Sequence, residues 1–335
     1  MTPVRIAVIG VGRIGTMHAG LLARQVEHAE LVAVHDRDAD LARRVGEDLG
    51  VAAAHDIGKL WSADLDAVAI CSSTETHVEL IEAAAGAGTH IFCEKPIAQD
   101  LAAVDRALAA VERAGVQLHV GFNRRFDPGH AAVRQAVVVG TIGQVHLVRI
   151  TSRDPAPPGL AYLERSGGIF IDMTIHDFDM ARFVTGSEVV EVLATGAVRV
   201  DPAIAQLGDL DTAVVILRHA DDTITTIDNS RCAVYGYDQR VEAFGSDGVA
   251  LSDNRPQNGS VVRTAQGGHT PPLPWFFLER YAESYVRQWE AVVQSVRDGS
   301  TPAVSGNDGR APIAIGLAAR RSVHEGRWVR VDEVE

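Results

Sequence analysis

Short apolar runs separated by helical patterns fill the first third of the chain. The apolar runs show little polar alternation, and stretches rich in Ala and Leu lie between them. Strands of this kind are buried on both faces, which is typical of a parallel sheet covered by helices on each side. We expect strands at 5–9, 31–35, 67–71, 90–93 and 117–121, and helices at 14–24, 40–49, 76–87 and 101–114. The pattern predicts a doubly wound α/β domain over residues 1–121.

After Phe122 the pattern changes to segments that alternate apolar and polar positions. Such segments without helices between them indicate a largely antiparallel sheet with one face free. We expect helices at 172–184, 275–296 and 308–324, strands at 189–200, 212–218, 223–230 and 328–331, and a long loop at 253–274. Residues 122–335 are therefore predicted to form a second domain of the α+β class.

Composition narrows the kinds of partner. The 31 Lys and Arg residues against 44 Asp and Glu residues give a formal net charge of −13, which argues against a nucleic-acid partner because phosphate backbones bind clustered basic side chains. Three cysteines and thirteen histidines form neither a disulfide framework nor a ligand-spaced group, so we expect no metal and a reducing, cytoplasmic location. The apolar run at 4–12 is too short to span a membrane and lacks the flanks of a signal peptide.

A glycine-rich turn follows the first predicted strand. Gly10, Gly12 and Gly15 form a GxGxxG pattern where the strand passes into a helix. The first glycine permits a tight turn, the second lets the backbone approach a pyrophosphate, and the third allows close packing of helix on strand. The helix N-terminus adds free N–H groups. Because such turns also occur for packing alone, the pattern by itself only favours a dinucleotide site.

An acidic residue at the end of the second predicted strand strengthens this interpretation. Asp36 lies 21 residues after Gly15, near the spacing of about 20 at which a carboxylate binds the ribose hydroxyls of the cofactor. Its charge would oppose a 2′-phosphate, so we expect NAD rather than NADP. Arg37 favours NADP instead, because an adjacent arginine can hold a 2′-phosphate.

Two further clusters carry candidate chemistry. Glu94, Lys95 and Pro96 follow the predicted strand at 90–93, and ligands lie beyond the carboxyl ends of the strands in a parallel sheet. We therefore expect Lys95 to point into the nicotinamide crevice. Asp172 and His176 are four residues apart, so on one helix they would share a face. A histidine suits the base that takes a hydroxyl proton as hydride leaves the same carbon.

Together these motifs resemble the Gfo/Idh/MocA oxidoreductase family. The resemblance is carried by the glycine pattern, residues 94–96, Asp172 with His176, and residues 123–127, and it extends to 235–238, 277–281 and 302–322. Within the family the sequence is most similar to the inositol 2-dehydrogenases. The resemblance covers essentially the whole chain and implies NAD-dependent oxidation of a secondary ring hydroxyl of a cyclic polyol, with myo-inositol converted to 2-keto-myo-inositol (scyllo-inosose).

The resemblance also implies site residues. Lys95, Asp172 and His176 would be the catalytic set, with His176 as base, Asp172 orienting it or binding a hydroxyl, and Lys95 stabilising the reacting oxygen. We expect the cofactor site to contain Gly10, Gly12, Arg13, Ile14, Gly15, Asp36, Arg37, Ser72, Ser73, Thr74, His77, Glu94 and Lys95, and substrate contacts at Asn123, Arg125, Asp154 and Tyr237. For the last three, a structural ion pair or packing role is an equal alternative. Residues 122–335 would then bind substrate and form a homotetramer through the open sheet face.

Two alternative functions stay open. A dehydrogenase of a pyranose sugar or of another inositol isomer would use the same catalytic set. An inert NAD-sensing module would keep the glycine turn and Asp36 but would need neither Lys95 nor His176.

Overall fold

The computed structural model describes residues 2–334, and the chain divides into two compact units. The first unit is Met1–Asn123 with Tyr285–Ile313, and the second is Arg124–Ser284 with Ala314–Glu335. The sequence suggested a single boundary after residue 121. In the structure the chain returns to the first unit for 29 residues, from Tyr285 to Ile313, before it re-enters the second.

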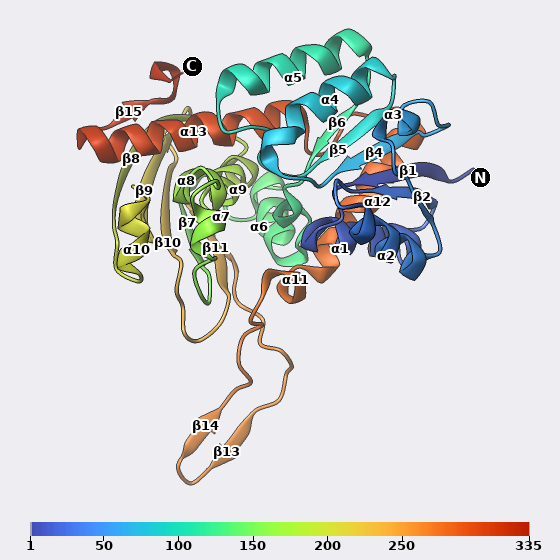
Figure 1. Cartoon of the computed structure of the whole chain (residues 1–335). Helices are drawn as coiled ribbons and strands as arrows, with labels where there is room; N and C mark the ends of the chain where they lie inside the picture. Colours follow the sequence, from blue (N-terminus) through green and yellow to red (C-terminus); the bar gives the residue numbers. More distant parts are fainter. Residues whose placement is uncertain (1, 335) are drawn as a thin grey trace. The chain divides into compact units, whose positions relative to one another are not determined.

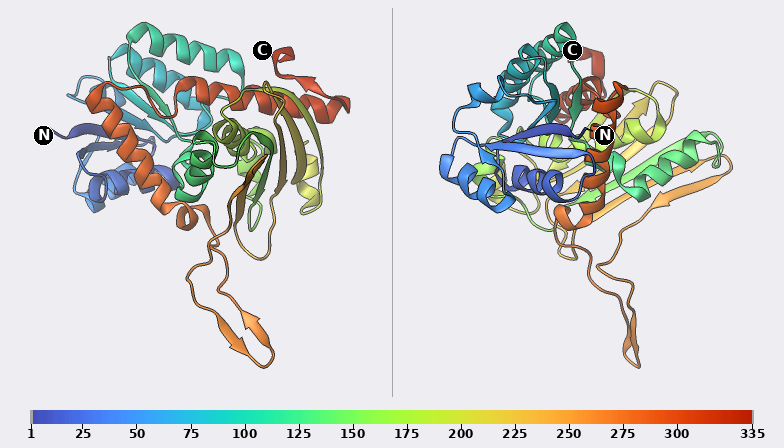
Figure 2. Two further views of the ribbon diagram at one scale, coloured as in Figure 1. Left: turned by 180° about the vertical axis from the view of Figure 1, so that it is seen from behind. Right: turned by 90° about the vertical axis from the view of Figure 1, so that its right-hand side faces the viewer.

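The first unit is built on the predicted parallel sheet (Figure 1). Its six strands lie in the order β3-β2-β1-β4-β5-β6, and they are β1 (Val4–Ile9), β2 (Ala29–His35), β3 (Ala52–Ala53), β4 (Ala67–Ile70), β5 (His90–Cys93) and β6 (Leu118–Val120). Helices α1 (Arg13–Arg24) and α2 (Ala39–Leu49) cover one face, and α4 (His77–Gly86) and α5 (Leu101–Ala114) cover the other, as Figures 1 and 2 show. The predicted doubly wound architecture is confirmed, and β3 and α3 (Ile57–Leu60) are short additions that the pattern did not indicate.

One buried tryptophan explains why α12 (Ala282–Asp298) belongs to the first unit from Tyr285 onward. Trp289 is completely buried, and its indole N–H donates to His18 Nδ1 of α1 at 2.8 Å. Its ring packs against Phe92 of β5 with 4.5 Å between ring centroids. A tryptophan buries a large apolar area at low cost when its N–H has an acceptor. Periodicity identifies a helix here but carries no information about this long-range partner.

The second unit contains the predicted, mostly antiparallel sheet. Its seven strands lie in the order β12-β11-β7-β10-β9-β8-β15, and β7 with β10 is the parallel pair. The strands are β7 (Val145–Arg153), β8 (Val189–Ala197), β9 (Thr212–His219), β10 (Ile224–Ser230), β11 (Asp238–Gly245), β12 (Gly248–Ser252) and β15 (Val329–Arg330). Helices α6 (Pro128–Val138), α7 (Leu160–Leu163) and α10 (Pro202–Gln206) also belong to this unit.

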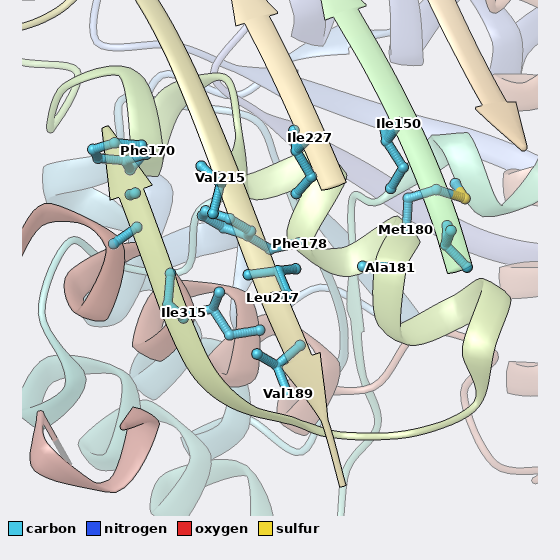
Figure 3. Close-up of a cluster of buried hydrophobic side chains, with 14 of the residues drawn as sticks. Ile150, Phe170, Phe178, Met180, Ala181, Val189, Val215, Leu217, Ile227 and Ile315 are labelled. Atoms are coloured by element: carbon cyan, nitrogen blue, oxygen red, sulfur yellow. The ribbon is translucent and has the colours of Figure 1, made fainter. Parts of the chain in front are cut away.

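The core of the second unit lies on one face of this sheet. In Figure 3, Val215 and Leu217 of β9 and Ile227 of β10 face Phe178 of α9 (Ile175–Thr185), and Ile315 of α13 (Gly306–Glu325) lies in the same cluster. Alternate residues of β9 are buried and the residues between them are more exposed. Full burial of such a side chain contributes about 1.5–3 kcal/mol, so the sheet is held to its helices from this face.

The opposite face of the sheet is exposed and partly apolar. Val214, Ile224, Phe244, Val249 and Leu251 are between 42% and 58% exposed. Strand register places Phe244 opposite Leu147 and Val249, and Leu147 opposite Ile224. These residues therefore share one face, which is the free face that the alternating pattern predicts.

Three local expectations differ from the structure. The expected helix at 172–184 is broken into α8 (Ile169–Asp172) and α9, with Met173 and Thr174 between them. The expected helix at 275–296 is divided into the short α11 (Phe277–Arg280) and α12, with Tyr281 between them. The expected loop at 253–274 contains a hairpin of β13 (Val262–Thr264) and β14 (Gly267–His269).

The break before α9 has a polar cause. The Thr174 hydroxyl donates to Asn229 Oδ1 of β10 at 2.6 Å, and the Thr174 N–H reaches back to the Ile169 carbonyl at 2.9 Å. Thr174 is thus bound to the sheet instead of continuing the helical ladder. Asp172 and His176 do not lie on one helix, and the prediction that they share a helical face is wrong.

None of the helices within residues 2–334 has the length and apolar character needed to cross a membrane.

Candidate active site

The glycine turn between β1 and α1 is shaped by close backbone contacts. Gly10 has φ +85°, and a Cβ there would lie 2.5 Å from the Ser72 backbone. A Cβ on Gly15 would overlap the Gly10 carbonyl, whereas a Cβ on Gly12 would meet nothing within 4 Å. Gly12 is the N-cap of α1 and supplies no side chain to the first N–H groups. The turn therefore leaves space and free donors in front of the helix that begins with Arg13 and Ile14, as a pyrophosphate requires.

Asp36 is bound to this turn from the end of β2. Its Oδ2 accepts the Val11 N–H at 2.8 Å, and its Oδ1 accepts the Asp38 N–H at 2.9 Å. Each carboxylate oxygen can accept a further hydrogen bond. The two bonds from backbone N–H groups fix the orientation of the carboxylate. Arg37 is exposed. The carboxylate, and not the guanidinium, is therefore the group that is held beside the glycine turn.

The residues after β4 are joined to those after β5 by a buried histidine. His77 places Nδ1 2.9 Å from the Pro96 carbonyl and Nε2 3.0 Å from the Ser72 carbonyl, and burial lowers the pKa of His77 below its usual value. The Ser72 and Thr76 hydroxyls are 2.7 Å apart. Ser73 and Thr74 lie in the turn between these residues. His77 thus ties two loops of the sheet edge together from within the protein.

Glu94 is oriented by the same histidine that receives the tryptophan bond. Since His18 Nδ1 accepts the Trp289 N–H, its Nε2 carries the proton and donates to Glu94 Oε1 at 2.9 Å. Glu94 Oε2 accepts the Lys95 N–H at 3.2 Å. A Cβ on Gly121 would lie 2.9 Å from the Glu94 carboxylate, so the chain after β6 needs glycine there. Lys95 itself is half-buried, and its peptide bond to Pro96 is cis.

All of these residues lie where parallel strands end. Gly10 follows β1, Asp36 follows β2, Ser72 follows β4 and Glu94 follows β5. Because the strands are parallel, their carboxyl ends form one edge of the sheet, which is the ligand-binding edge of doubly wound folds. An open helix N-terminus, a fixed acid and a lysine at one edge fit a dinucleotide cofactor.

Asp172, the acid of the expected catalytic set, is held between two hydrogen-bond donors of the second unit, which we call the clamp. Asp172 Oδ1 accepts the Tyr162 hydroxyl at 2.6 Å, and Asp172 Oδ2 accepts Arg231 Nη1 at 3.0 Å. The Arg231 side chain is fully buried. Burial of the hydroxyl and the neighbouring Asp172 carboxylate raise the pKa of Tyr162. Tyr162 therefore stays protonated and donates, and Asp172 is fixed on both sides.

His176 stands out by its exposure. It is the one residue between Ile169 and Ala181 that is not buried, and it lies at the second position of α9. Buried neighbours such as Ile175 and Asp177 fix the backbone on either side of it. A fixed backbone and a ring that is partly exposed suit a positioned base.

The acidic residue after β7 has an unusual proton affinity. Burial raises the pKa of Asp154 to about 6, and the nearby Arg124 and Arg231 offset part of that rise. Asp172 and Asp177 are close enough to raise it further. Asp154 thus belongs to the same charged group as Asp172.

The remaining expected substrate contacts divide into two kinds. Arg125 makes a short ion pair with Asp179, with Nη2 to Oδ1 at 2.6 Å, and lies over the Phe183 ring. Asn123 is buried, and its amide nitrogen has no hydrogen-bond partner within the described part of the chain. Tyr237 is buried, with its hydroxyl 3.4 Å from Arg124 Nη2. Arg125 has a structural partner, whereas the buried Asn123 amide nitrogen has none among the described residues.

Several residues that build the site were not found from the sequence. Tyr162, Arg231 and His18 carry no local motif, and Arg231 and Asp172 are 59 positions apart. Arg124 lies beside the predicted Arg125 yet is the more buried of the two, donating to Asp177 Oδ1 at 2.8 Å. The only available signal was the pair of arginines itself, which does not say which one turns inward.

No group of three or more His, Cys, Asp or Glu side chains within residues 2–334 is placed to hold a metal ion.

Comparison with known proteins agrees with this architecture. A model of an oxidoreductase family with an NAD-binding Rossmann fold matches residues 4–122, and a model of the GFO/IDH/MocA C-terminal domain matches residues 130–251. A myo-inositol 2-dehydrogenase of Thermotoga maritima is 49% identical, covering 98% of this chain and 99% of its own. An inositol 2-dehydrogenase of Rhizobium meliloti is 46% identical, with 98% and 99% covered.

A solved structure extends the comparison to ligands. The scyllo-inositol dehydrogenase of Lactobacillus casei with bound NAD(H) and scyllo-inositol is 31% identical, has a TM-score of 0.92, and covers 99% of this chain and 100% of its own. The family resemblance predicted from the sequence motifs is confirmed. This chain belongs to the Gfo/Idh/MocA family of oxidoreductases, and its first unit is the NAD-binding Rossmann fold of that family.

Proposed function

We propose that this chain oxidises a secondary ring hydroxyl of an inositol to a ketone, with NAD as the hydride acceptor and myo-inositol as the main substrate. One observation carries the catalytic part of this proposal. His176 is the one partly exposed residue in an otherwise buried segment, and that segment also contains Asp172, whose carboxylate is held by Tyr162 and Arg231. The substrate class is supported by the inositol dehydrogenases among the relatives at 46–49% identity.

Three features of the first unit would act on the cofactor and the reacting oxygen. The open N-terminus of α1 binds the pyrophosphate through backbone N–H groups, and Asp36 accepts hydrogen bonds from the adenosine ribose. NAD, when bound, supplies the carbon that accepts the hydride. We propose that Lys95 donates a hydrogen bond to the reacting oxygen and stabilises its developing charge.

The second unit supplies the proton acceptor. The His176 imidazole takes the hydroxyl proton, which the substrate must lose as its carbon becomes a carbonyl. Asp172 orients that ring or binds a neighbouring hydroxyl. Tyr162 and Arg231 act through Asp172, so they are positioning residues. Asp154 and the Asn123 amide are proposed contacts for the other ring hydroxyls. The Tyr237 hydroxyl lies 3.4 Å from Arg124 Nη2, so Tyr237 supports that arginine.

We also propose a homotetramer assembled through the exposed sheet face that contains Phe244 and Leu251. Contiguous apolar surface of this kind marks interaction sites. The three free cysteines suit a reducing compartment, so we propose that the enzyme works in the cytoplasm, in the breakdown of inositols.

The first prediction concerns cofactor choice. Wild-type enzyme should have a higher kcat/KM with NAD than with NADP, because the Asp36 carboxylate opposes a 2′-phosphate. Asp36→Asn keeps an acceptor for the Val11 N–H and removes the charge, so the preference should fall roughly tenfold or more. Steady-state kinetics with both cofactors and one polyol measure this. Equal use of NADP by the wild type would mean that Arg37 governs the pocket.

The second prediction concerns the substrate. Myo-inositol should support NAD reduction, with an inosose as product, in a panel of inositol isomers and aldoses followed by NADH absorbance. Product analysis by mass spectrometry should show loss of two hydrogens. A panel in which only a pyranose reacts would replace the substrate and leave the family membership intact.

The third prediction concerns the base. His176→Ala should lower kcat by at least about 10²-fold, since a positioned base contributes 10²–10⁴-fold, and NADH affinity should stay nearly unchanged. In the wild type the rate should rise with pH near neutrality, as the imidazole loses its proton, and the variant should lose that limb. The measurement is a pH–rate profile with NADH binding titrated by fluorescence.

A control tests whether the pH dependence belongs to a carboxyl group instead. The pKa of Asp154 lies at about 6, so Asp154→Asn tests whether the limb belongs to that carboxyl. The limb should survive in Asp154→Asn. Its survival in His176→Ala, with near-normal kcat, would show that another group is the base.

The fourth prediction concerns the clamp on Asp172. Tyr162→Phe removes one donor from the carboxylate, and hydrogen bonds to charged groups contribute about 1.5–3 kcal/mol, so kcat should fall by roughly tenfold with little change in NADH affinity. An Asp172 carboxylate with one donor fewer attracts the protonated histidine more strongly, so the pH limb should move to higher pH.

Tyr235→Phe is the matched control, because Tyr235 also donates to an aspartate, Asp238, at 2.6 Å. It should change neither kcat nor the limb. If Tyr162→Phe, like Tyr235→Phe, changes neither kcat nor the pH limb, the hydrogen bond from Tyr162 to Asp172 is structural only. The role of His176 is then judged from the pH–rate profile of His176→Ala alone.

A further inference from the structure

One guanidinium of the second unit is buried with a single hydrogen-bonded partner. The Arg231 side chain is fully buried, and it donates from Nη1 to Asp172 Oδ2 at 3.0 Å. Its Nε and Nη2 atoms have no hydrogen-bond partner in the part of the chain that the structure describes. A buried charge is costly unless opposite charge lies close to it. The surroundings of the unpaired side of Arg231 therefore bear on its stability and on its direction.

A second carboxylate, that of Asp209, faces this side of the guanidinium. Asp209 comes after α10 and directly after Gly208, which turns the chain at φ +69°. Asp209 Oδ2 lies 3.6 Å from Arg231 Nη2, and the Asp209 side chain is 10% exposed. Asp209 Oδ2 also has no hydrogen-bond partner among the described residues. Arg231 is thus held between two nearly buried carboxylates, one by a hydrogen bond and one by charge.

The other oxygen of Asp209 holds the helix that carries Asp172. Asp209 Oδ1 accepts the N–H of Ile169 at 2.9 Å, and Ile169 is the first residue of α8, which ends at Asp172. A Cβ on Gly168, where φ is +81°, would lie 3.0 Å from this oxygen, so glycine lets the backbone approach the carboxylate. Asp209 therefore acts on Asp172 by two routes, through the backbone of α8 and through the guanidinium of Arg231.

The chain next to Asp209 also fixes the backbone of Arg231. The Arg231 N–H donates to the Asp211 carbonyl at 2.8 Å. Asp211 is fully buried, and its carboxylate accepts three backbone N–H groups, those of residues 199–201, at 2.7, 2.8 and 3.1 Å. These bonds anchor the segment that follows α10. Both the backbone and the guanidinium of Arg231 are thus attached to one fixed segment.

We propose that Asp209 is a positioning residue for the oxidation and that it sets the direction of the Asp172 carboxylate through Arg231 and α8. This inference rests on the proposed function, in which Asp172 acts on the substrate or on His176. A guanidinium that is held from one side only can tilt, and the carboxylate bound to it moves with it. Because a misplacement of about 1 Å at a reacting centre can cost roughly 10²-fold in rate, the charge of Asp209 affects kcat from behind the site.

The first test is Asp209→Asn, which keeps an acceptor for the Ile169 N–H and removes the charge that faces Arg231. With a polyol that the wild type oxidises, kcat per NADH-binding site should fall about tenfold, and the NADH dissociation constant should stay nearly unchanged. Counting the sites by NADH titration removes any contribution from unfolded protein.

Asp201→Asn is the matched control for this charge change. The Asp201 carboxylate likewise accepts an N–H in the first turn of a helix, that of Ala203 in α10, at 2.9 Å. Asp201→Asn should therefore keep the wild-type kcat. A wild-type kcat in Asp209→Asn, or an equal loss in Asp201→Asn, would overturn the proposal.

A second test does not depend on the substrate. Asp172→Asn and Asp209→Asn each leave Arg231 with one of its two carboxylates, and the double variant leaves it with neither of them. Because an uncompensated buried charge is strongly destabilising, the melting temperature of the double variant should fall by more than the sum of the two single shifts. Shifts that simply add would show that Asp209 and Asp172 do not share Arg231, which also overturns the proposal.

The outcomes separate this inference from the proposed function. If the wild type oxidises a sugar and no inositol, the substrate assignment fails, and kcat of Asp209→Asn is compared with the wild type on that sugar. If His176→Ala keeps the wild-type rate, the assignment of the base fails, whereas the loss in Asp209→Asn should remain.

Discussion

The second unit depends on a balance of buried charge. Asp154, Asp172 and Asp177 lie close enough to influence one another, and two buried arginines, Arg124 and Arg231, stand among them. Asp177 is bonded to Arg124 at 2.8 Å and Asp172 to Arg231 at 3.0 Å. Removing one partner of a buried pair costs about 3–5 kcal/mol, because the other charge is left uncompensated. The fold of this region and the direction of Asp172 are thus set by one constraint.

The same balance of buried charge bears on the pKa of Asp154, the third carboxyl of this group. Two guanidinium groups cannot neutralise three carboxylates, and the pKa of Asp154 is raised to about 6, chiefly because its carboxyl group is buried. Asp154 therefore gains a proton at a higher pH than an ordinary aspartate does. A neutral acid can donate a hydrogen bond to a hydroxyl oxygen, whereas a carboxylate only accepts. Protonation of Asp154 thus changes it from an acceptor only into a group that can also donate a hydrogen bond.

The sequence predicted those parts of the structure that depend on neighbours along the chain. Gly10, Gly12 and Gly15 meet strict local limits on space and backbone angle, and Asp36 follows a strand of predictable length, so their positions follow from spacing. Tyr162, Arg231 and His18 act through partners far away in sequence, and nothing near them marks that role. The return of α12 to the first unit was not predicted for the same reason, because the hydrogen bond from Trp289 to His18 joins residues 271 positions apart.

The break between α8 and α9 shows why the incorrect helix prediction still identified a plausible pair. In one continuous helix, Asp172 and His176 would face the same way and compete for the same surroundings. Instead, Asp172 ends α8 and accepts a hydrogen bond from the buried Arg231. The Thr174 hydroxyl bonds to Asn229, and α9 begins at Ile175 with His176 partly exposed. Asn229 also donates to Asp177 Oδ2 at 2.8 Å. Asn229 of β10 therefore binds both the residue at the break and the carboxylate of Asp177, and Arg231, which follows β10, binds Asp172.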